Sequence, residues 1–159
     1  MRKILGIDPG IRNTGWSVIT LEEYNIKLIG NGSISIDSRL NTNDRLFKLF
    51  CKLNKIIKDF SPNEAAIEEI FINKNPKSSI TLCYARGIAL LSLTVAKLSI
   101  TEYKANFVKK SITGNGHADK KQVMYMVKQI TQNSDIKCHN SSDATAVAIC
   151  HAYSKRKIS

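Results

Sequence analysis

The first third of the chain alternates between apolar and polar residues in patterns that predict β-strands. Residues 3–8 form a short apolar run that ends in an Asp-Pro-Gly turn, as expected of a buried strand. Residues 14–20 and 26–36 alternate with a period of two, which is typical of strands. Three consecutive strands of this kind predict an antiparallel meander.

From about residue 42 the apolar residues recur every three or four positions, which predicts helices. Five segments are expected to be helical: 42–60, 78–97, 104–112, 118–131 and 141–154. Two short apolar runs, 65–71 and 99–103, are expected to be strands. This order predicts an α/β fold with a five-stranded mixed sheet flanked by helices. We expect residues 1–154 to form a single domain and residues 155–159 a basic tail.

Composition and the N-terminus indicate a soluble protein. Apolar residues make up 43% of the 159-residue chain, an ordinary fraction for a globular domain. We see no apolar run that approaches the roughly 20 residues needed to cross a bilayer. The acid at position 8 follows the first apolar run too soon for a signal peptide. We therefore expect a cytoplasmic location with no membrane contact.

The four cysteines form no CxxC pair, which argues against a zinc ribbon or a redox motif. Two Cys-His pairs, Cys138-His139 and Cys150-His151, do have the residue types of a zinc site. Neither spacing matches a zinc finger, however, and the second pair lies within an apolar helical run. We therefore expect reduced, mostly buried thiols.

The chain carries a formal net charge of +11 and has a pI near 9.6. A strongly basic surface attracts polyanions, of which nucleic acid is the most common. Lysine far outnumbers arginine, and isoleucine and asparagine are frequent, so an AT-rich genome is a second explanation of the charge. Charge alone leaves both explanations open.

Three carboxylates far apart in the sequence stand where packing explains them poorly. Asp8 ends a buried strand, and Asp143 precedes the last apolar helix. Glu68 lies beside Glu69 in an apolar strand, where only one of the two can face the same side as Asp8. Each position has a structural alternative. Asp8 could cap its turn, the glutamates could meet solvent at a strand end, and Asp143 could favour the helix dipole behind an Asn140 N-cap.

Taken together, the three acids suggest a metal site. Mg²⁺ binds several carboxylate oxygens and retains some of its waters, and Mn²⁺ is expected to substitute for it. In phosphodiester hydrolysis, one metal ion activates water while a second stabilises the leaving oxygen. We find no Ser-His-Asp or Cys-His arrangement in the sequence that competes for the catalytic role. The three acids therefore point to metal-dependent nuclease chemistry.

Several motifs occur in a fixed order along the chain. They are ILGIDPG at 4–10 with TG at 14–15, AIEEIF at 66–71 with KN at 74–75, YARG at 84–87, GNG at 114–116 and DATAVA at 143–148. In this order they resemble the RuvC Holliday-junction resolvases, a family within the RNase H-like superfamily, and the resemblance covers essentially the whole chain. It implies an RNase H-like nuclease domain. It also implies a structure-selective endonuclease that resolves four-way DNA junctions by symmetric nicking during recombination and repair.

The resemblance also implies roles for individual residues at the cleavage centre. Asp8, Glu68 and Asp143 match metal-binding catalytic acids. Lys109 and Lys120 match basic residues near the scissile phosphate, where a cation stabilises developing charge. Ordinary surface lysines are the alternative for these two positions.

Other residues match contacts with the DNA. Phe71 matches an aromatic residue that stacks on an unpaired base, and a core aromatic is its alternative. Further phosphate contacts are expected from Arg12, Lys74, Lys77 and Arg86. Two symmetric cuts require two active sites, so the resemblance implies a homodimer, to which we expect helix 78–97 to contribute. It also implies a RuvA–RuvB branch-migration complex as partner.

One position departs from the family pattern, which has an acid or sometimes a His three residues before the final Asp. This chain has Asn140, whose amide binds a metal ion weakly and cannot act as a base. Asn140 is then an engineered replacement, a natural variant of a metal and catalytic position, or a residue whose role passes to His139. The alternative function is a junction-binding protein that is catalytically impaired. A nuclease acting on RNA–DNA hybrids is a weaker third hypothesis.

Overall fold

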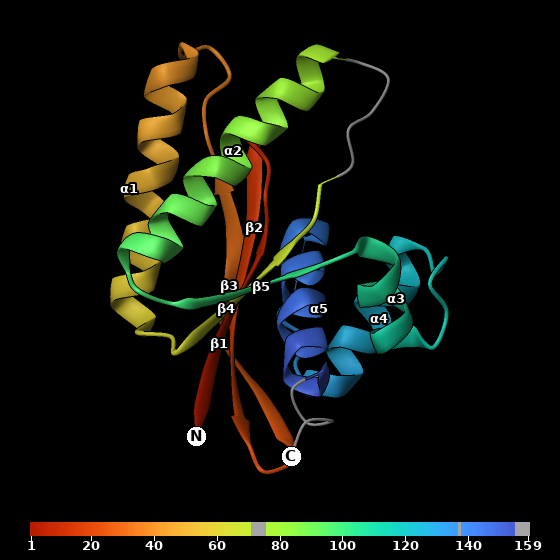
Figure 1. Ribbon diagram of the computed structural model, residues 1–159. Helices are drawn as coiled ribbons and strands as arrows, with labels where there is room; N and C mark the ends of the chain where they lie inside the picture. Colours follow the sequence, from red (N-terminus) through yellow and green to blue (C-terminus); the bar gives the residue numbers. More distant parts are fainter. Residues whose placement is uncertain (71–75, 137, 155–159) are drawn as a thin grey trace.

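A twisted mixed sheet runs through the middle of the molecule (Figure 1). The computed structural model describes residues 1–70, 76–136 and 138–154. Within these residues the sheet has five strands in the order β3-β2-β1-β4-β5. The strands are β1 (Arg2–Asp8), β2 (Asn13–Glu22), β3 (Asn25–Ser35), β4 (Glu64–Glu68) and β5 (Ser99–Tyr103). The first three form the predicted antiparallel meander, and β4 and β5 run parallel to β1.

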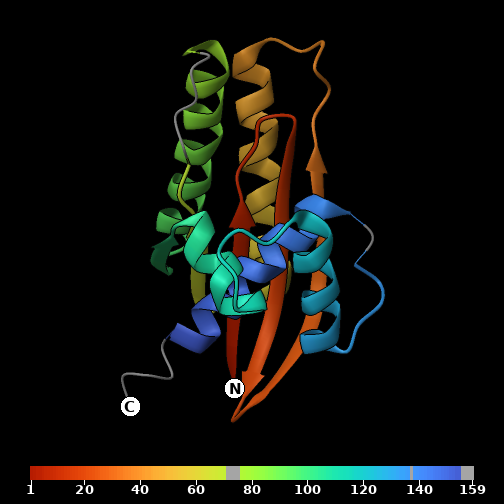
Figure 2. The same ribbon diagram turned by 90° about the vertical axis from the view of Figure 1, so that its right-hand side faces the viewer.

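Helices cover both faces of the sheet (Figures 1 and 2). One layer consists of α1 (Thr42–Phe60) and α2 (Pro76–Val95). The opposite layer consists of α3 (Ala105–Thr113), α4 (Lys120–Thr131) and α5 (His139–Ser154). Of these three, α5 contacts the strands most extensively, and α3 and α4 pack against α5. The five predicted helices and five predicted strands are thus all present.

Alternation along the strands divides the core into two parts, one on each face. Ile4 and Ala66 pack toward α3, α4 and α5, whereas Leu5 and Ile67 pack toward α1 and α2. Successive strand residues face opposite sides, so each strand contributes to both clusters. Fully buried leucines such as Leu53 anchor the second cluster, and truncating one to alanine costs about 2–5 kcal/mol in proteins of this kind.

Two glycines allow α5 to lie directly on the sheet. A Cβ atom on Gly6 would lie 2.1 Å from the carbonyl oxygen of Ala144. A Cβ atom on Gly15 would lie 2.0 Å from the carbonyl oxygen of Asn140. Any larger residue at these positions would push the first turns of α5 away from β1 and β2. The glycines therefore determine how close the start of α5 comes to the end of β1.

Local hydrogen bonds explain where the element bounds differ from those predicted. The last helix begins at His139 rather than 141, and the Ser142 amide donates to the carbonyl of Cys138. The helix predicted from 118 begins at 120, because Asp119 caps it in a capping box with Gln122. Strand β4 ends at Glu68, short of the predicted residue 71.

Helix α2 contradicts the expectation that no apolar segment approaches membrane-spanning length. By length and composition alone, Ser78–Val95 is apolar enough to cross a bilayer. In the structure one face of the helix is packed inside the protein, through Ala85, Ala89 and Leu93. Arg86 in the middle of the segment pairs with Glu102 of β5. The apolar residues of the other face are exposed.

Candidate active site

Asp8, Glu68 and Asp143 line one pocket of about 210 Å³, although Asp8 and Asp143 lie 135 positions apart in the sequence. Lys109 and Lys120 line the same pocket. The carboxylates come from the ends of β1 and β4 and the first turns of α5. The lysines come from α3 and the first position of α4. The structure therefore brings together all three acids and both lysines that the sequence singles out for the cleavage centre.

Strand alternation explains why the two strand carboxylates face each other. Asp8 lies an even number of residues from Ile4, and Glu68 likewise from Ala66, so both side chains lie on the α5 face of the sheet. Glu69 follows the last residue of β4, and its backbone amide donates to the carbonyl of Tyr103. Because β1 and β4 are parallel neighbours, their carboxyl ends meet at the same edge. The close approach of α5 at this edge places Asp143 over them.

Burial and mutual repulsion keep these carboxylates from ionising easily. Burial, and then the charges of Glu68 and Asp143, raise the pKa of Asp8 to about 7. Burial, with the charge of Asp143 beside it, raises the pKa of Glu68 to about 7. The pKa of Asp143 is also raised by burial, although the charge of Lys120 opposes that shift. Groups shifted in this way by burial and like charges are typical of functional sites.

The lysines offset only part of this negative charge. The ammonium of Lys120 lies 3.5 Å from Oδ2 of Asp143. Lys109 and Lys120 both lower the pKa of Glu68 against the larger effect of burial. With all five side chains ionised, three carboxylates face two ammonium groups in this pocket. One negative charge remains uncompensated, which favours a cation.

The donor set fits a hard divalent cation. Carboxylate oxygens are the protein ligands that Mg²⁺ takes, usually one or two of them with water completing the octahedron. Within the described residues, no three His, Cys, Asp or Glu side chains stand close enough to hold an ion as they lie. The charges of Glu68 and Asp143 help to raise the pKa of Asp8, and a bound cation would relieve this repulsion.

The sequence and the fold both match known proteins. The family described as crossover junction endodeoxyribonuclease RuvC matches residues 4–151. The chain belongs to the RuvC family. The RuvC of Wolbachia sp. subsp. Drosophila simulans is 60% identical over 98% of this chain and 96% of its own length. The RuvC of Ehrlichia canis is 49% identical over 96% of this chain and 97% of its own.

Solved structures of RuvC share the fold. The Thermus thermophilus RuvC structure has a TM-score of 0.88 and 25% identity, covering 98% of this chain and 96% of that one. T. thermophilus RuvC in complex with Holliday junction substrate has a TM-score of 0.92 at 24% identity, covering 99% and 96%. These matches confirm the predicted RNase H-like fold with its five-stranded mixed sheet.

Asn140 lies outside the carboxylate pocket of this RuvC chain. It lines a neighbouring cavity, together with Arg12 from the loop between β1 and β2. Its amide nitrogen donates to the hydroxyl of Ser33 over 3.4 Å. His139 is exposed, and its charge lowers the pKa of Asp143. Asn140 thus lines a different cavity from the three acids.

The remaining predicted DNA contacts are dispersed. Arg86 lies on α2, where its guanidinium pairs with Glu102. Lys77 lies in the first turn of the same helix. Phe71 and Lys74 lie outside the described residues. Their roles stay predictions.

The thiols of this RuvC chain are free, and two of the four are exposed. The expectation of mostly buried thiols is therefore wrong for Cys51 and Cys83, which lie on the outer faces of α1 and α2. Cys150 is buried as expected. His151, beside it, is hydrogen-bonded to Tyr103 and Glu64, which agrees with the structural interpretation of the Cys-His pairs.

Sequence reasoning missed Arg45. Its side chain lines the cavity that also holds Arg12 and Asn140. A signal was present, because Arg45 precedes Leu49 and Leu53 at intervals of four on the apolar side of its helix. Arg45 therefore lies on the same side of the helix as the buried leucines, whereas the lysines of this helix lie on its outer face.

Proposed function

We propose that this chain is a metal-dependent endonuclease that resolves four-way DNA junctions by paired, symmetric nicks. The observation that carries the proposal is the convergence of Asp8, Glu68 and Asp143 in one pocket beside Lys109 and Lys120. Membership of the RuvC family supports the junction as substrate. Its named relatives are endonucleases, which favours cutting over the alternative of binding without cutting.

Mg²⁺ is the proposed cofactor, with Mn²⁺ as a substitute, and Asp8, Glu68 and Asp143 would hold it. When bound, such a cation lowers the pKa of its water and stabilises the leaving oxygen of the phosphodiester. The ends of β1 and β4 position the carboxylates of Asp8 and Glu68, and the first turns of α5 position that of Asp143. Lys109 and Lys120 provide ammonium groups to neutralise charge that develops on the phosphate. Asn140 is left out of the proposed ligands because it lines the neighbouring cavity.

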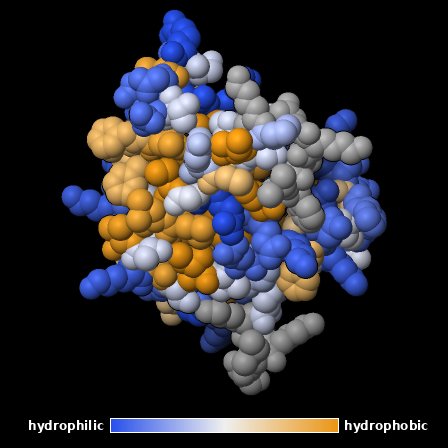
Figure 3. Space-filling view, turned by 45° about the horizontal axis from the view of Figure 1, so that its top comes forward, coloured by the Kyte–Doolittle hydropathy of each residue, from blue (hydrophilic) through white to orange (hydrophobic). Residues whose placement is uncertain are grey.

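Two cuts on a two-fold symmetric junction call for two copies of the chain, and α2 offers the surface for pairing. Four large side chains on this helix are about half exposed or more: Ile80, Tyr84, Leu91 and Val95. Their spacing of four, seven and four residues places them along one side of the helix. A Cβ atom added to Gly87, between them, would meet no atom of the described residues within 4 Å, so a second helix can approach closely there. Figure 3 shows hydrophobic side chains gathered on the side of the molecule where α1 and α2 lie.

Further partners follow from the family. A RuvA–RuvB branch-migration complex would deliver the junction to the protein. The proposed location of this reaction is the cytoplasm. Phe71 is proposed to stack on an unpaired base at the junction centre, and Arg12, Lys74, Lys77 and Arg86 to contact phosphates. The net charge of +11 suits a substrate with four negatively charged arms.

The test is cleavage of a labelled four-way junction in Mg²⁺ or Mn²⁺. Paired nicks at symmetric positions are expected, with an RNA–DNA hybrid duplex left uncut. Asp8→Asn should abolish nicking while it leaves junction binding in EDTA intact. Asp59→Asn, which changes an exposed acid on α1, is the matched control and should cut normally. Preferential cutting of the hybrid, or no metal-dependent cutting at all, would contradict the proposal.

A further inference from the structure

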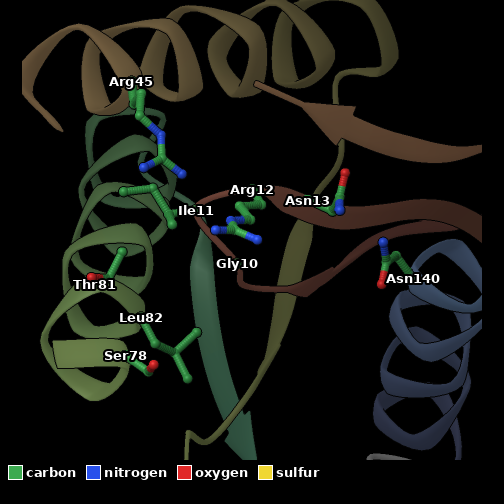
Figure 4. A pocket seen from close by; sticks show the side chains of 9 residues that line it. All are labelled: Gly10, Ile11, Arg12, Asn13, Arg45, Ser78, Thr81, Leu82 and Asn140. Carbon is green, nitrogen blue, oxygen red and sulfur yellow. The ribbon is translucent and has the colours of Figure 1, made fainter. Parts of the chain in front are cut away.

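A second cavity, of about 640 Å³, opens beside the carboxylate pocket (Figure 4). It lies between the β1–β2 loop and helices α1, α2 and α5. The polar side chains that line it are Arg12, Asn13, Arg45, Ser78, Thr81 and Asn140. No described residue of this lining carries a carboxylate. The cavity therefore has two positive charges, several hydrogen-bonding groups and a volume within the range of ligand-binding pockets, about 300–1,000 Å³.

The guanidinium of Arg45 is the most informative group in this cavity. Its Nε and Nη2 atoms are buried and have no hydrogen-bond partner among the described residues. Buried N–H donors are almost always paired in folded proteins, so this pair of donors indicates an acceptor that comes from outside the chain. A guanidinium presents its donors as a planar fork, which matches two oxygens of a phosphate.

Arg45 lines the cavity and forms no ion pair with a described acid. The neighbouring acid, Asp44, is engaged in the helix cap, where it accepts from Nδ2 of Asn41 over 2.8 Å. Arg12 is exposed and forms no ion pair within the described residues. Figure 4 shows the side chains of Arg45 and Arg12 extending from α1 and the loop into the same space. Asn140 adds a neutral amide at a place where a carboxylate would repel an anion.

We propose that this cavity binds a backbone phosphate of the DNA, displaced from the phosphate that is cut, with Arg45 as its principal ligand and Arg12 and Asn140 beside it. The inference rests on the proposed function, because it takes junction DNA as the source of the phosphate. The loop that carries Arg12 begins directly after Asp8, which places the two sites next to each other along the chain. The bound phosphate fixes the position of the DNA relative to the carboxylates without reading bases.

The experiment compares junction binding by the full chain, Arg45→Gln and Lys58→Gln in EDTA across a range of NaCl. Lys58 is an exposed cation at the other end of α1, and its replacement removes the same charge. Arg45→Gln is expected to raise Kd about tenfold near 0.1 M salt and to reduce the slope of log K against log salt by about 0.9 for each phosphate that the variant no longer neutralises. Lys58→Gln should stay within about twofold with the parent slope.

A second arm locates the phosphate. Single methylphosphonate linkages remove one backbone charge at a time from the junction. The linkage that replaces the bound phosphate should weaken binding by the parent, as should its two-fold related counterpart in the junction. The same linkage should have no further effect on Arg45→Gln, because that variant no longer binds this phosphate. Asn140→Asp should weaken binding in EDTA, because the new carboxylate repels the phosphate. If Asn140 were only a metal ligand, the substitution would have no effect in the absence of metal. Equal responses of parent and Arg45→Gln at every linkage would overturn the proposal.

Folding and cleavage controls separate the possible failures. Arg45→Gln should melt no lower than the parent, because Nε and Nη2 lose no hydrogen bond. If it nevertheless fails to fold, Arg12→Gln in the exposed loop replaces it, with the same expected loss of affinity and slope. A parent that cuts the junction while both arginine variants bind it normally defeats the cavity proposal alone. A parent that neither binds nor cuts defeats the proposed function as well.

Discussion

The ammonium of Lys120, the first residue of α4, lies 3.5 Å from the carboxylate of Asp143 near the start of α5. Asp119 places it there, because its capping box fixes where α4 begins. The Lys120 side chain is 65% exposed and that of Asp143 is 20% exposed, so the ion pair stands at the mouth of the pocket. Such an exposed pair adds little stability. The ammonium of Lys120 lies between solvent and the carboxylates, where it can contact a phosphate that enters the pocket.

Lys120→Gln should therefore slow cleavage rather than destabilise the fold. We expect single-turnover cleavage of a four-way junction to fall about 10²-fold, the usual effect of removing one group that stabilises transition-state charge. The melting temperature should change by no more than about 1 °C, because the pair is exposed. Lys121→Gln is the matched control, since Lys121 is the next residue and is exposed. Equal losses from the two variants would assign the effect to general surface charge.

The raised pKa of Asp8 predicts how stability depends on pH. A carboxyl whose pKa is about 7 in the folded state and near 3.8 when unfolded holds its proton more tightly when folded. Its contribution to stability is full below about pH 4 and is lost as pH rises through about 7. Asp8→Asn, which cannot ionise, should be more stable than the parent in EDTA at pH 8, on the order of 2 kcal/mol.

Urea unfolding in EDTA at pH 4 and pH 8 measures this difference. The advantage of Asp8→Asn should vanish at the lower pH. Adding Mg²⁺ at pH 8 should raise the melting temperature of the parent and leave that of Asp8→Asn nearly unchanged, since a cation stabilises only the fold that binds it. A variant less stable than the parent at pH 8 would show that the carboxylate is not under electrostatic strain.

Strand alternation shows from the sequence that only one of Glu68 and Glu69 can share a face with Asp8. The resemblance assigned Glu68, and the parallel pairing of β1 and β4 agrees with that choice. Asp143 required the resemblance to a known family, because a carboxylate near a helix start is as well explained by the helix dipole. The contact between α5 and Gly6 depends on the assembled fold.

Asn140 and Arg45 show where sequence reasoning ends. Asn140 lies three residues before Asp143, a spacing that puts both on one side of a helix, yet the two side chains line different cavities. The backbone of Asn140 packs directly against Gly15 of β2. The side chain of Asn140 donates to the hydroxyl of Ser33 on β3, the outer strand of the meander. For Arg45 the sequence shows only its alignment with Leu49 and Leu53, and the burial of its Nε and Nη2 atoms emerges in the folded structure.

Leu91→Glu should separate the proposed dimer. Leu91 is 50% exposed at the centre of the C-terminal half of α2, and a carboxylate there would be buried without a partner in a paired helix. Light scattering should show the parent as a dimer and the variant as a monomer at micromolar concentration. The monomer should lose paired nicking of a junction. Tyr125→Glu is the matched control, because Tyr125 is also a large exposed side chain but lies on α4, and this variant should remain dimeric.

A fully buried histidine joins three elements, α5, β4 and β5. Nδ1 of His151 lies 2.9 Å from the Tyr103 hydroxyl, and Nε2 lies 2.9 Å from Oε2 of Glu64. Arg2 closes the chain, with its Nε 2.6 Å from Oε1 of the same glutamate. Both ring nitrogens of His151 therefore have a hydrogen-bond partner, and the tautomer decides which of them donates. The network connects α5 to β4, β5 and β1.

Tyr103→Phe and His151→Ala should each destabilise the fold, and their effects should not add. Tyr103→Phe leaves Nδ1 of His151 without its hydrogen-bond partner, at a cost of about 1–3 kcal/mol. His151→Ala costs about 2–5 kcal/mol, because it adds a cavity to the missing hydrogen bonds. The double variant should lose less than the sum, by about 0.5–3 kcal/mol, as expected of residues in one network. Urea unfolding measures all three, with His117→Ala in an exposed loop as the control. Additive losses would mean that the two side chains act independently, and the network would then not be what holds the C-terminal half of α5 on the sheet.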